Sequence, residues 1–271
     1  MTTEKELAYR YDLFIAPEWR SRFDALLDDN VEIPAEGEIL EVNCGTGGHA
    51  LEIAERLKDK GEVVAVDASA ERLELAGAKA LVAKLRNVHF EHASPRQLPF
   101  ESNRFDAVIG DASLAETQEI EAMLAEMIRV AKPGARVTIM LATHGSFDEF
   151  FSIYWEALME AGLIDELWGR LEAMIRERGT VSDAEAMAAR LGLRDVQSIT
   201  GKEEFDFETG AEFLESPVIA DPFLSEWLSI IPPGKRQEVT AAITKVIERE
   251  RHEMPFDVSA KATLVTGTKI D

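Results

Sequence analysis

The sequence predicts an α/β fold in which a mostly parallel sheet carries helices on both faces. Between residues 38 and 143, short β-rich runs alternate with segments of helical spacing, which is typical of strands and helices that alternate in a parallel sheet. Hydrophobic residues make up 46% of the 271 residues and charged residues 30%, so the chain can bury a full core. The length fits one large domain with an insertion, or one domain plus a smaller one.

The first half of the chain contains the elements of this sheet in order. Residues 1–34 predict a helical N-terminal cover, in which Pro17 suits the first turn of a helix. The core follows at residues 35–145, and its strand candidates are EILEVN, EVVAVD, NVHFEH, FDAVIGD and ARVTIMLAT. Helices are expected near residues 47 to 59, 69 to 85 and 115 to 131. The last of these has one apolar face and is expected to end at KPG, a Pro-Gly stop.

The second half of the chain is predicted to be mostly helical. A helical extension is expected over residues 146–192, where Ser182 and Glu185 have the spacing of a capping box before a short helix that stops at Gly192. Residues 193–271 are expected to hold the last two strands, RDVQSITGKEEFDF and KATLVTGTKI, with a helical insertion at 208–255 between them. These two strands predict a hairpin-like pair that finishes the sheet.

Charge and cysteine content exclude several classes of protein. The formal net charge of -22 would repel nucleic acids and anionic membrane surfaces. Cys44 is the only cysteine, which excludes an internal disulfide and a cysteine-based zinc site and suits a reducing compartment. No signal peptide is visible at the N-terminus, and no stretch approaches the roughly 20 apolar residues of a membrane span. We therefore expect a cytoplasmic protein. We also expect no metal site, because His89 and His92 point to opposite faces of a strand.

The turn after the first strand is the most informative stretch for function, because ligands of open α/β sheets lie beyond the carboxyl ends of the strands. In ILEVNCGTGGHALEIA, residues 39–54, Gly45 and Gly47 let the backbone approach a ligand closely. With Ala50 they satisfy G-x-G-x-x-A, and Asp67 closes the second strand, where a carboxylate can accept hydrogen bonds from ribose hydroxyls. A NAD-dependent oxidoreductase is one interpretation, and a tight turn without a ligand is another.

Four stretches in order and spacing resemble the successive motifs of class I S-adenosylmethionine-dependent methyltransferases. They are ILEVNCGTG, VVAVDAS, LPFESNRFDAVI and MIRVAKPGARVTI. The resemblance is to the small-molecule type that includes ubiquinone and menaquinone biosynthesis enzymes, and it covers residues 36 to 143, with ATLVTGTKI similar to that family's antiparallel last strand. It implies a Rossmann-like, seven-stranded sheet, S-adenosyl-L-methionine as cofactor, and methyl transfer to a small molecule. Aromatic side chains in the opening segment and the late insertion, among them Trp19, Phe213 and Trp227, would suit an apolar or aromatic acceptor.

The resemblance also assigns residues to the cofactor. The positions implied are Tyr11, Glu41, Asn43, Gly45, Gly47, Asp67, Ala68, Ala93, Ser94 and Asp111. Glu41 would anchor the ammonium of the methionine moiety or fix the amides of the loop, and Tyr11 belongs to a Tyr-Asp pair that covers the cofactor in the family. Asp67 would hold the ribose, and Asp111 would lie beside the reacting methyl group.

Two positions depart from the family pattern. Asn43 replaces a glycine, although asparagine tolerates positive φ better than other non-glycine residues. Ser94 replaces an aspartate that often contacts the adenine amino group. If each change removes one contact, the loss is about 1 to 2 kcal/mol apiece. These departures motivate a further alternative, a catalytically silent protein of the same fold that binds a ligand or a partner.

The catalytic candidates lie after the fourth and fifth strands. Methyl transfer is a direct displacement, so the protein mainly aligns the reactants and excludes water, and a proton acceptor is needed only for a protonated nucleophile. Asp111 and His144 are the candidates for that role. GDAS after the fourth strand does not resemble the sequence typical of methyltransferases that act on base or glutamine amino groups. A small-molecule substrate is therefore expected.

The late insertion, residues 208–255, is expected to have an apolar helix face. Such a face would suit either a lid over the site or a homodimer surface.

Overall fold

The computed structural model describes residues 3–252 and 254–270, which divide into two compact units. The first unit contains the chain up to Leu141, together with Thr180–Gly201 and the residues from Ala262 on. The second unit contains Ala142–Gly179 and Lys202–Lys261. Among the described residues, no helix is both long and apolar enough to span a bilayer.

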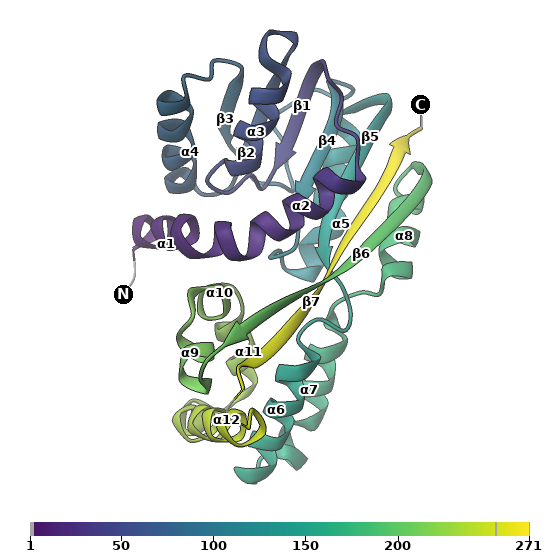
Figure 1. The fold of residues 1–271 in the computed structure, drawn as a ribbon. Helices are drawn as coiled ribbons and strands as arrows, with labels where there is room; N and C mark the ends of the chain where they lie inside the picture. The colour runs from purple at the N-terminus through teal and green to yellow at the C-terminus, as the bar shows by residue number, and fades with distance from the viewer. Residues whose placement is uncertain (1–2, 253, 271) are drawn as a thin grey trace. The chain divides into compact units, whose positions relative to one another are not determined.

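The described residues contain one seven-stranded sheet with the order β3-β2-β1-β4-β5-β7-β6 (Figure 1). Its strands are β1 (Gly37–Val42), β2 (Gly61–Asp67), β3 (Val88–His92), β4 (Phe105–Asp111), β5 (Ala131–Ala142), β6 (Leu193–Phe207) and β7 (Phe256–Lys269). The first five strands pair in parallel, and the last strands are antiparallel. The predicted fold class, a mostly parallel seven-stranded sheet with an antiparallel last strand, is confirmed.

The strand order reverses between β1 and β4, which lie side by side at the centre of the first unit. The parallel register pairs Val42 with Val66 and with Gly110, so the carboxyl ends of β1, β2 and β4 meet at one edge of the sheet. Leu40 and Val42 belong to a buried apolar cluster with helix α5 (Thr117–Val130). Glu41 points to the opposite face because side chains alternate along a strand. This geometry places the ends of the three strands where α/β proteins bind ligands.

The remaining elements of the first unit are helical. They are α1 (Glu4–Arg10), the π-helical stretch η1 (Tyr11–Arg20), α2 (Ser21–Asn30), α3 (Gly48–Leu57), the 3-10 turn η2 (Lys58–Lys60), α4 (Ala70–Ala83), α5 (Thr117–Val130) and α8 (Val181–Arg190). The predicted apolar face of α5 is present, since Met123, Leu124 and Met127 are almost fully buried. The three core helices predicted between the strands are thus found at the expected places.

The second unit is helical around the distal parts of β6 and β7. Its helices and turns are α6 (Asp148–Glu160), α7 (Ile164–Glu177), α9 (Gly210–Glu215), α10 (Pro217–Ile219), η3 (Ala220–Leu224), α11 (Ser225–Trp227), η4 (Leu228–Ile230), η5 (Pro233–Lys235) and α12 (Arg236–Glu250). Its core is aromatic: the Trp227 ring stacks on Phe150 with ring centroids 4.4 Å apart and on Phe223 at 5.3 Å. Tyr154 donates a hydrogen bond from its hydroxyl to the carbonyl oxygen of Trp227 at 2.8 Å.

Several local predictions are wrong at the level of single residues. Pro17 does not begin a helix, because it lies inside the π-helical stretch of a helical segment that runs from Glu4 to Asn30. The capping box of α8 is made by Thr180 and Asp183 instead of Ser182 and Glu185: the Thr180 Oγ1 accepts from the Asp183 N–H at 3.2 Å. Helix α5 ends at Val130, and the KPG sequence lies within β5.

Candidate functional site

A cavity of about 320 Å³ lies at the carboxyl ends of β1, β2 and β4, and we call it the strand-end cavity. A volume of this size is at the lower end of the range of small-molecule sites. Six of the residues that the sequence assigns to a cofactor line it: Tyr11, Asn43, Asp67, Ala68, Ser94 and Asp111. The structure therefore brings together residues that lie up to 100 positions apart in the chain.

Asp67 fixes the glycine turn from the neighbouring strand. Its Oδ2 accepts the N–H of Gly45 at 2.9 Å, and its Oδ1 accepts the N–H of Ser69 at 2.9 Å. Burial raises the pKa of Asp67, against the opposing charge of Arg72. The carboxylate thus joins the turn after β1 to the turn after β2, and it does so at the wall of the strand-end cavity.

The two motif glycines have different reasons to lack a side chain. Gly45 has φ of +58°, and a Cβ there would lie 2.5 Å from the Tyr11 hydroxyl, whose ring covers this part of the turn. Gly47 has φ of +80°, and a Cβ there would lie 2.8 Å from the Cβ of Ala76. Gly45 is therefore required by the approach of Tyr11, whereas Gly47 is required by packing between α3 and α4.

Asn43 adopts the left-handed conformation that its family position would need, with φ of +58°. Its Nδ2 donates to the backbone oxygen of Asp111 at 2.9 Å, so the side chain joins the ends of β1 and β4. Ser94 also lines the cavity, and its Oγ accepts the N–H of Arg96 at 3.3 Å. Ala93 is half-buried against the core, and its N–H donates to the Asp67 backbone oxygen at 3.2 Å.

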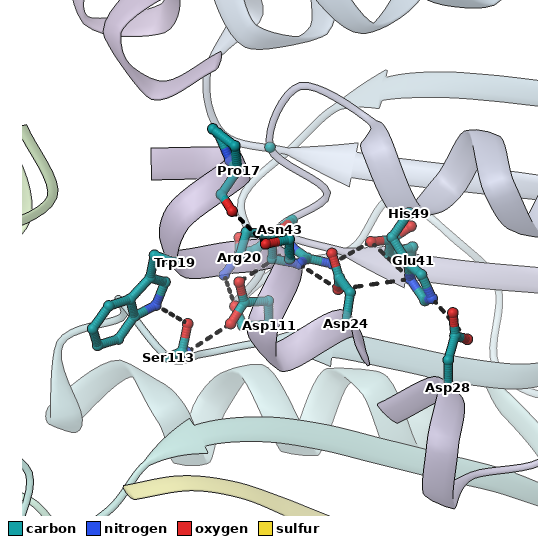
Figure 2. Close-up of polar contacts among 12 residues, drawn as sticks. Pro17, Trp19, Arg20, Asp24, Asp28, Glu41, Asn43, His49, Asp111 and Ser113 are labelled. Atoms are coloured by element: carbon teal, nitrogen blue, oxygen red, sulfur yellow. Dashed lines mark hydrogen bonds and ion pairs between the residues drawn. The ribbon is translucent and has the colours of Figure 1, made fainter. Parts of the chain in front are cut away.

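A buried guanidinium lies beneath these strand ends (Figure 2). Arg20 of η1 is 5% exposed, and its Nη1 donates to the Asn43 carbonyl oxygen at 2.8 Å and to Asp111 Oδ2 at 3.2 Å. Its Nη2 donates to Glu41, and its Nε donates to Asp24 Oδ1 at 2.7 Å. We call Arg20, Asp24, Glu41, His49 and Asp111 the Arg20 cluster.

The electrostatics of the Arg20 cluster keep it charged despite its burial. Burial alone would lower the pKa of Arg20, but Asp24, Asp111 and Glu41 outweigh it and raise that pKa. Burial alone would raise the pKa of Glu41, but the charges of His49 and Arg20 lower it. Burial dominates at Asp24, whose pKa rises to about 6 despite the opposing charge of Arg20.

His49, near the start of α3, is the second cation of the Arg20 cluster. Burial would lower its pKa, but the charge of Glu41 and the nearby carboxylates of Asp28 and Asp24 raise it to about 10. Its Nε2 lies 3.5 Å from Asp28 Oδ1, and its Nδ1 lies 3.5 Å from Glu41 Oε1. Glu41 Oε2 and His49 Nδ1 are both buried, and neither atom has a hydrogen-bond partner among the residues that the structure describes.

A second cavity of about 340 Å³ lies between the N-terminal helices and the start of α3, and we call it the helix-side cavity. Arg20, Asp24, Thr46 and His49 contribute to its wall. Tyr11 lines both cavities and is only 4% exposed. The guanidinium of Arg72 lies 4.0 Å from the centre of its ring.

The two catalytic candidates fall in different places. Asp111 ends β4 at the strand-end cavity, where its Oδ1 accepts the N–H of Ser113 at 2.8 Å. Ser113 Oγ in turn accepts from Trp19 Nε1 at 2.9 Å, which anchors the N-terminal segment to the end of β4. His144 belongs to the second unit, where its side chain is exposed and its backbone N–H donates to the Gly179 oxygen at 2.9 Å.

The sequence did not identify Arg20, Asp24 or His49 as site residues. One signal was present: Arg20 and Asp24 are one helical turn apart and lie next to Trp19 and Phe23, which are buried. From sequence alone, an ion pair beside an apolar helix face is interpreted as a solvent-exposed pair. Its burial becomes apparent only when the residues that pack against it from other elements are known. Across the part of the chain that the structure describes, no group of three or more His, Cys, Asp and Glu side chains is arranged to hold a metal ion.

Comparisons with known proteins agree with the geometry of the first unit. Residues 39–134 match the family model described as a methyltransferase domain. A demethylmenaquinone methyltransferase of Lactococcus lactis subsp. lactis (strain IL1403) is 32% identical over 124 residues, which covers 45% of this chain and 49% of that protein. The chain therefore spans about half the length of the curated relatives it matches.

Solved structures show the same fold over most of the chain. The YcgJ protein from Bacillus subtilis superposes with a TM-score of 0.61 at 19% identity, covering 93% of this chain and 99% of that one. Phosphoethanolamine N-methyltransferase 2 of Haemonchus contortus, solved with S-adenosylhomocysteine, gives a TM-score of 0.59 at 17% identity and covers 99% of this chain and 58% of that one. The resemblance predicted from the four sequence motifs is confirmed for this core.

Proposed function

We propose that this chain, whose core has the class I methyltransferase fold, binds S-adenosyl-L-methionine and transfers its methyl group to a small-molecule acceptor. The strand-end cavity carries the proposal, because it combines Asp67 at the end of β2 with Asn43 and Asp111 at the point where the strand order reverses. The match of residues 39–134 to the methyltransferase domain supports the same reaction.

The residues of the strand-end cavity fit an adenosyl group. Each carboxylate oxygen of Asp67 accepts one backbone N–H and retains capacity for a second hydrogen bond, which a ribose hydroxyl could donate. The Ser94 hydroxyl can accept a hydrogen bond from an adenine amino group. Ala68, Leu114 and Ala115 add apolar surface to the wall, which suits the faces of a purine ring.

The chemistry requires little more from the chain than positioning. S-adenosyl-L-methionine supplies an electrophilic methyl group that a nucleophile displaces directly. The chain has to orient the acceptor and exclude water, and the burial of Asp111 at the end of β4 favours a dry reaction site. Asp111 is our first candidate for taking a proton from a protonated nucleophile, and His144 after β5 is the second.

We propose an apolar or aromatic acceptor. Curated relatives that match half of this chain are named for demethylmenaquinone, which is a quinone. The net charge of -22 also disfavours polyanionic acceptors. The proposal is tested by following radiolabelled methyl transfer from S-adenosyl-L-methionine to a short-chain demethylmenaquinone and to phosphoethanolamine in parallel. Transfer to phosphoethanolamine alone would refute the apolar acceptor and leave the reaction class intact.

Calorimetric titration separates the proposed function from its alternatives. We expect saturable binding of S-adenosylmethionine and S-adenosylhomocysteine and no binding of NAD. Asp67→Asn should weaken both adenosyl ligands about tenfold, because one hydrogen-bonding charge is removed. Glu62→Gln is the matched control, because Glu62 lies at the other end of β2 and its side chain is 61% exposed. Removing the Glu62 charge should leave the affinity for both adenosyl ligands unchanged.

The other outcomes identify the alternatives. Binding of NAD without binding of the adenosyl ligands would indicate an oxidoreductase. Silence toward all three ligands would indicate a catalytically silent protein of this fold, an alternative favoured by the way Arg20 and Tyr11 fill the space around the glycine turn.

We also propose that the protein acts in the cytoplasm on a small molecule, without a nucleic-acid or membrane partner. The single cysteine, Cys44, is buried and unpaired, which suits a reducing compartment. A homodimer is part of the same proposal, and light scattering of the purified chain tests it.

A further inference from the structure

Acceptor groups at the ends of β1 and β4 converge on a single cation, the guanidinium of Arg20. The Asn43 carbonyl oxygen, Asp111 Oδ2 and Glu41 each accept an N–H of the Arg20 guanidinium (Figure 2). These acceptors come from two neighbouring strands, and Arg20 comes from η1. A ligand that brings a positive group to this place would therefore meet acceptors that already have a donor.

S-adenosyl-L-methionine would bring such a group, because its amino-acid end carries an ammonium and a carboxylate. The adenosyl end fits the strand-end cavity beside Asp67 and Ser94, as argued above. An ammonium on the same molecule needs hydrogen-bond acceptors within its reach. Two of the acceptors that Arg20 holds, the Asn43 carbonyl oxygen and the Asp111 carboxylate, belong to residues that line the strand-end cavity.

Tyr11 closes the same end of the site. Its ring lies against Gly45 and forms part of the wall of both cavities, so it separates the strand-end cavity from the helix-side cavity. Tyr11 and Arg20 are the first and last residues of η1, the π-helical stretch that also contains Pro17. π-helical stretches are rare and are often found at functional sites.

We propose that Arg20 is an internal competitor of the cofactor's ammonium group and so determines which adenosyl ligands the site prefers. This inference rests on the proposed function. The adenosyl part enters the strand-end cavity without any change at Arg20. The amino-acid part enters only when the guanidinium releases the Asn43 carbonyl oxygen and the carboxylates of Glu41 and Asp111. Arg20 keeps one partner when it moves, because Asp24 lies one turn away on the same helical segment.

On this proposal, the subsite for the adenosyl group is preformed, whereas the subsite for the amino-acid end of the ligand is occupied by the Arg20 guanidinium. Displacing Arg20 exchanges one set of charge-assisted hydrogen bonds for another, so the amino-acid end of the ligand adds little net affinity. The test therefore compares two ligands in calorimetric titration. S-adenosylhomocysteine has the amino-acid end, and 5′-methylthioadenosine lacks it.

For the unmodified chain, we expect S-adenosylhomocysteine to bind no more than about fivefold more tightly than 5′-methylthioadenosine. In Arg20→Gln, S-adenosylhomocysteine should bind about tenfold more tightly than in the unmodified chain, while the affinity for 5′-methylthioadenosine stays within about twofold. Arg22→Gln is the matched control: Arg22 is on the adjoining helix, forms an ion pair with Glu18 at the surface, and should change neither affinity.

Several outcomes would overturn the inference. If Arg20→Gln weakens S-adenosylhomocysteine and leaves 5′-methylthioadenosine unchanged, then Arg20 holds the amino-acid end instead of competing with it. Equal losses for both ligands would show a merely structural role. Because Arg20→Gln leaves buried carboxylates without their cation, the variant can fail to fold. The ligand comparison in the unmodified chain then decides alone, and a preference for S-adenosylhomocysteine above about a hundredfold refutes the competitor.

The failure of the proposed function has a different signature. If neither adenosyl ligand binds to the unmodified chain, to Arg20→Gln or to Arg22→Gln, the proposed function is wrong and the inference falls with it. If 5′-methylthioadenosine binds and the preference between the ligands is the same in Arg20→Gln as in the unmodified chain, the proposed function stands and only the competitor role of Arg20 is refuted.

Discussion

The raised pKa of His49 predicts that the chain loses stability as the pH rises above neutral. Its imidazole is 1% exposed and lies between Glu41, Asp24 and Asp28. The pKa is about 10 in the folded chain, against 6.5 for an unperturbed histidine. Because the folded state holds the proton more tightly, the stabilisation is complete below pH 6.5 and is lost as the pH rises through the folded pKa.

The size of the effect follows from linkage. Each pH unit well inside the interval between the two pKa values changes the free energy of unfolding by about 1.4 kcal/mol. At pH 6.5, His49 is still protonated in half of the unfolded molecules. The free energy of unfolding therefore falls by about 2 kcal/mol between about pH 6.5 and 8.5. Two other groups lie outside this window: the pKa of Asp24 is about 6, and burial raises the pKa of Cys44 well above its ordinary value of 9.0.

Urea unfolding followed by circular dichroism at three pH values between about 6.5 and 8.5 measures this loss. His49→Asn removes the titrating group, so its free energy of unfolding should vary much less over the same window. His89→Asn is the matched control, because the His89 side chain is 56% exposed and its ion pair with Glu62, at 3.8 Å, lies at the surface. If the unmodified chain and His49→Asn show the same pH dependence, His49 is not held protonated by its carboxylates and the reasoning is wrong.

Two further predictions concern stability and use the same urea measurement. Gly47→Ala should lower the free energy of unfolding by about 2 kcal/mol or more, because the new Cβ meets a methyl group at 2.8 Å and φ is +80°, while Gly48→Ala, with open space around it, should change it by less than about 0.5 kcal/mol. Trp19→Phe should cost about 1 to 2 kcal/mol, because Ser113 Oγ loses its buried donor, and the corresponding change at Trp155, which is 42% exposed, should cost less than about 0.5 kcal/mol. A Gly47→Ala chain as stable as Gly48→Ala, or a Trp19→Phe chain as stable as Trp155→Phe, would contradict the packing described for these residues.

The sheet was predictable because its signal is local and repeated. Each core strand is a short apolar run bounded by turn residues, and the register follows from the parallel order once the helices between the strands are recognised. The conformation of Asn43 was also predictable from local sequence. Asn43 stands at a turn position where a glycine is expected, and asparagine is one of the few other residues that accept a φ of +58°.

Helix boundaries were less predictable because neighbouring residues offer equivalent signals. Thr180 with Asp183 and Ser182 with Glu185 both have the spacing of a capping box, and only the backbone path selects the first pair. Pro17 is a common first-turn residue, yet it lies in the middle of a helical segment because the π-helical stretch tolerates it.

The Arg20 cluster could not be predicted because its energetics are not local. Arg20 and Glu41 are 21 positions apart, and Arg20 and Asp111 are 91 apart. Each residue by itself resembles an ordinary surface charge, and only burial in common turns the set into a network with shifted pKa values. The role of Glu41 was implied by a family resemblance, but the resemblance contained no information about an arginine that occupies its carboxylate.

The strand order has a consequence for how the chain is made. β7 (Phe256–Lys269) lies between β5 and β6, although it follows both of them in the sequence and is therefore synthesised after them. Until it emerges, the facing edges of β5 and β6 have no neighbour to receive their backbone hydrogen bonds. A nascent chain in which β6 has emerged and β7 has not therefore exposes two open strand edges, which are suited to aggregation.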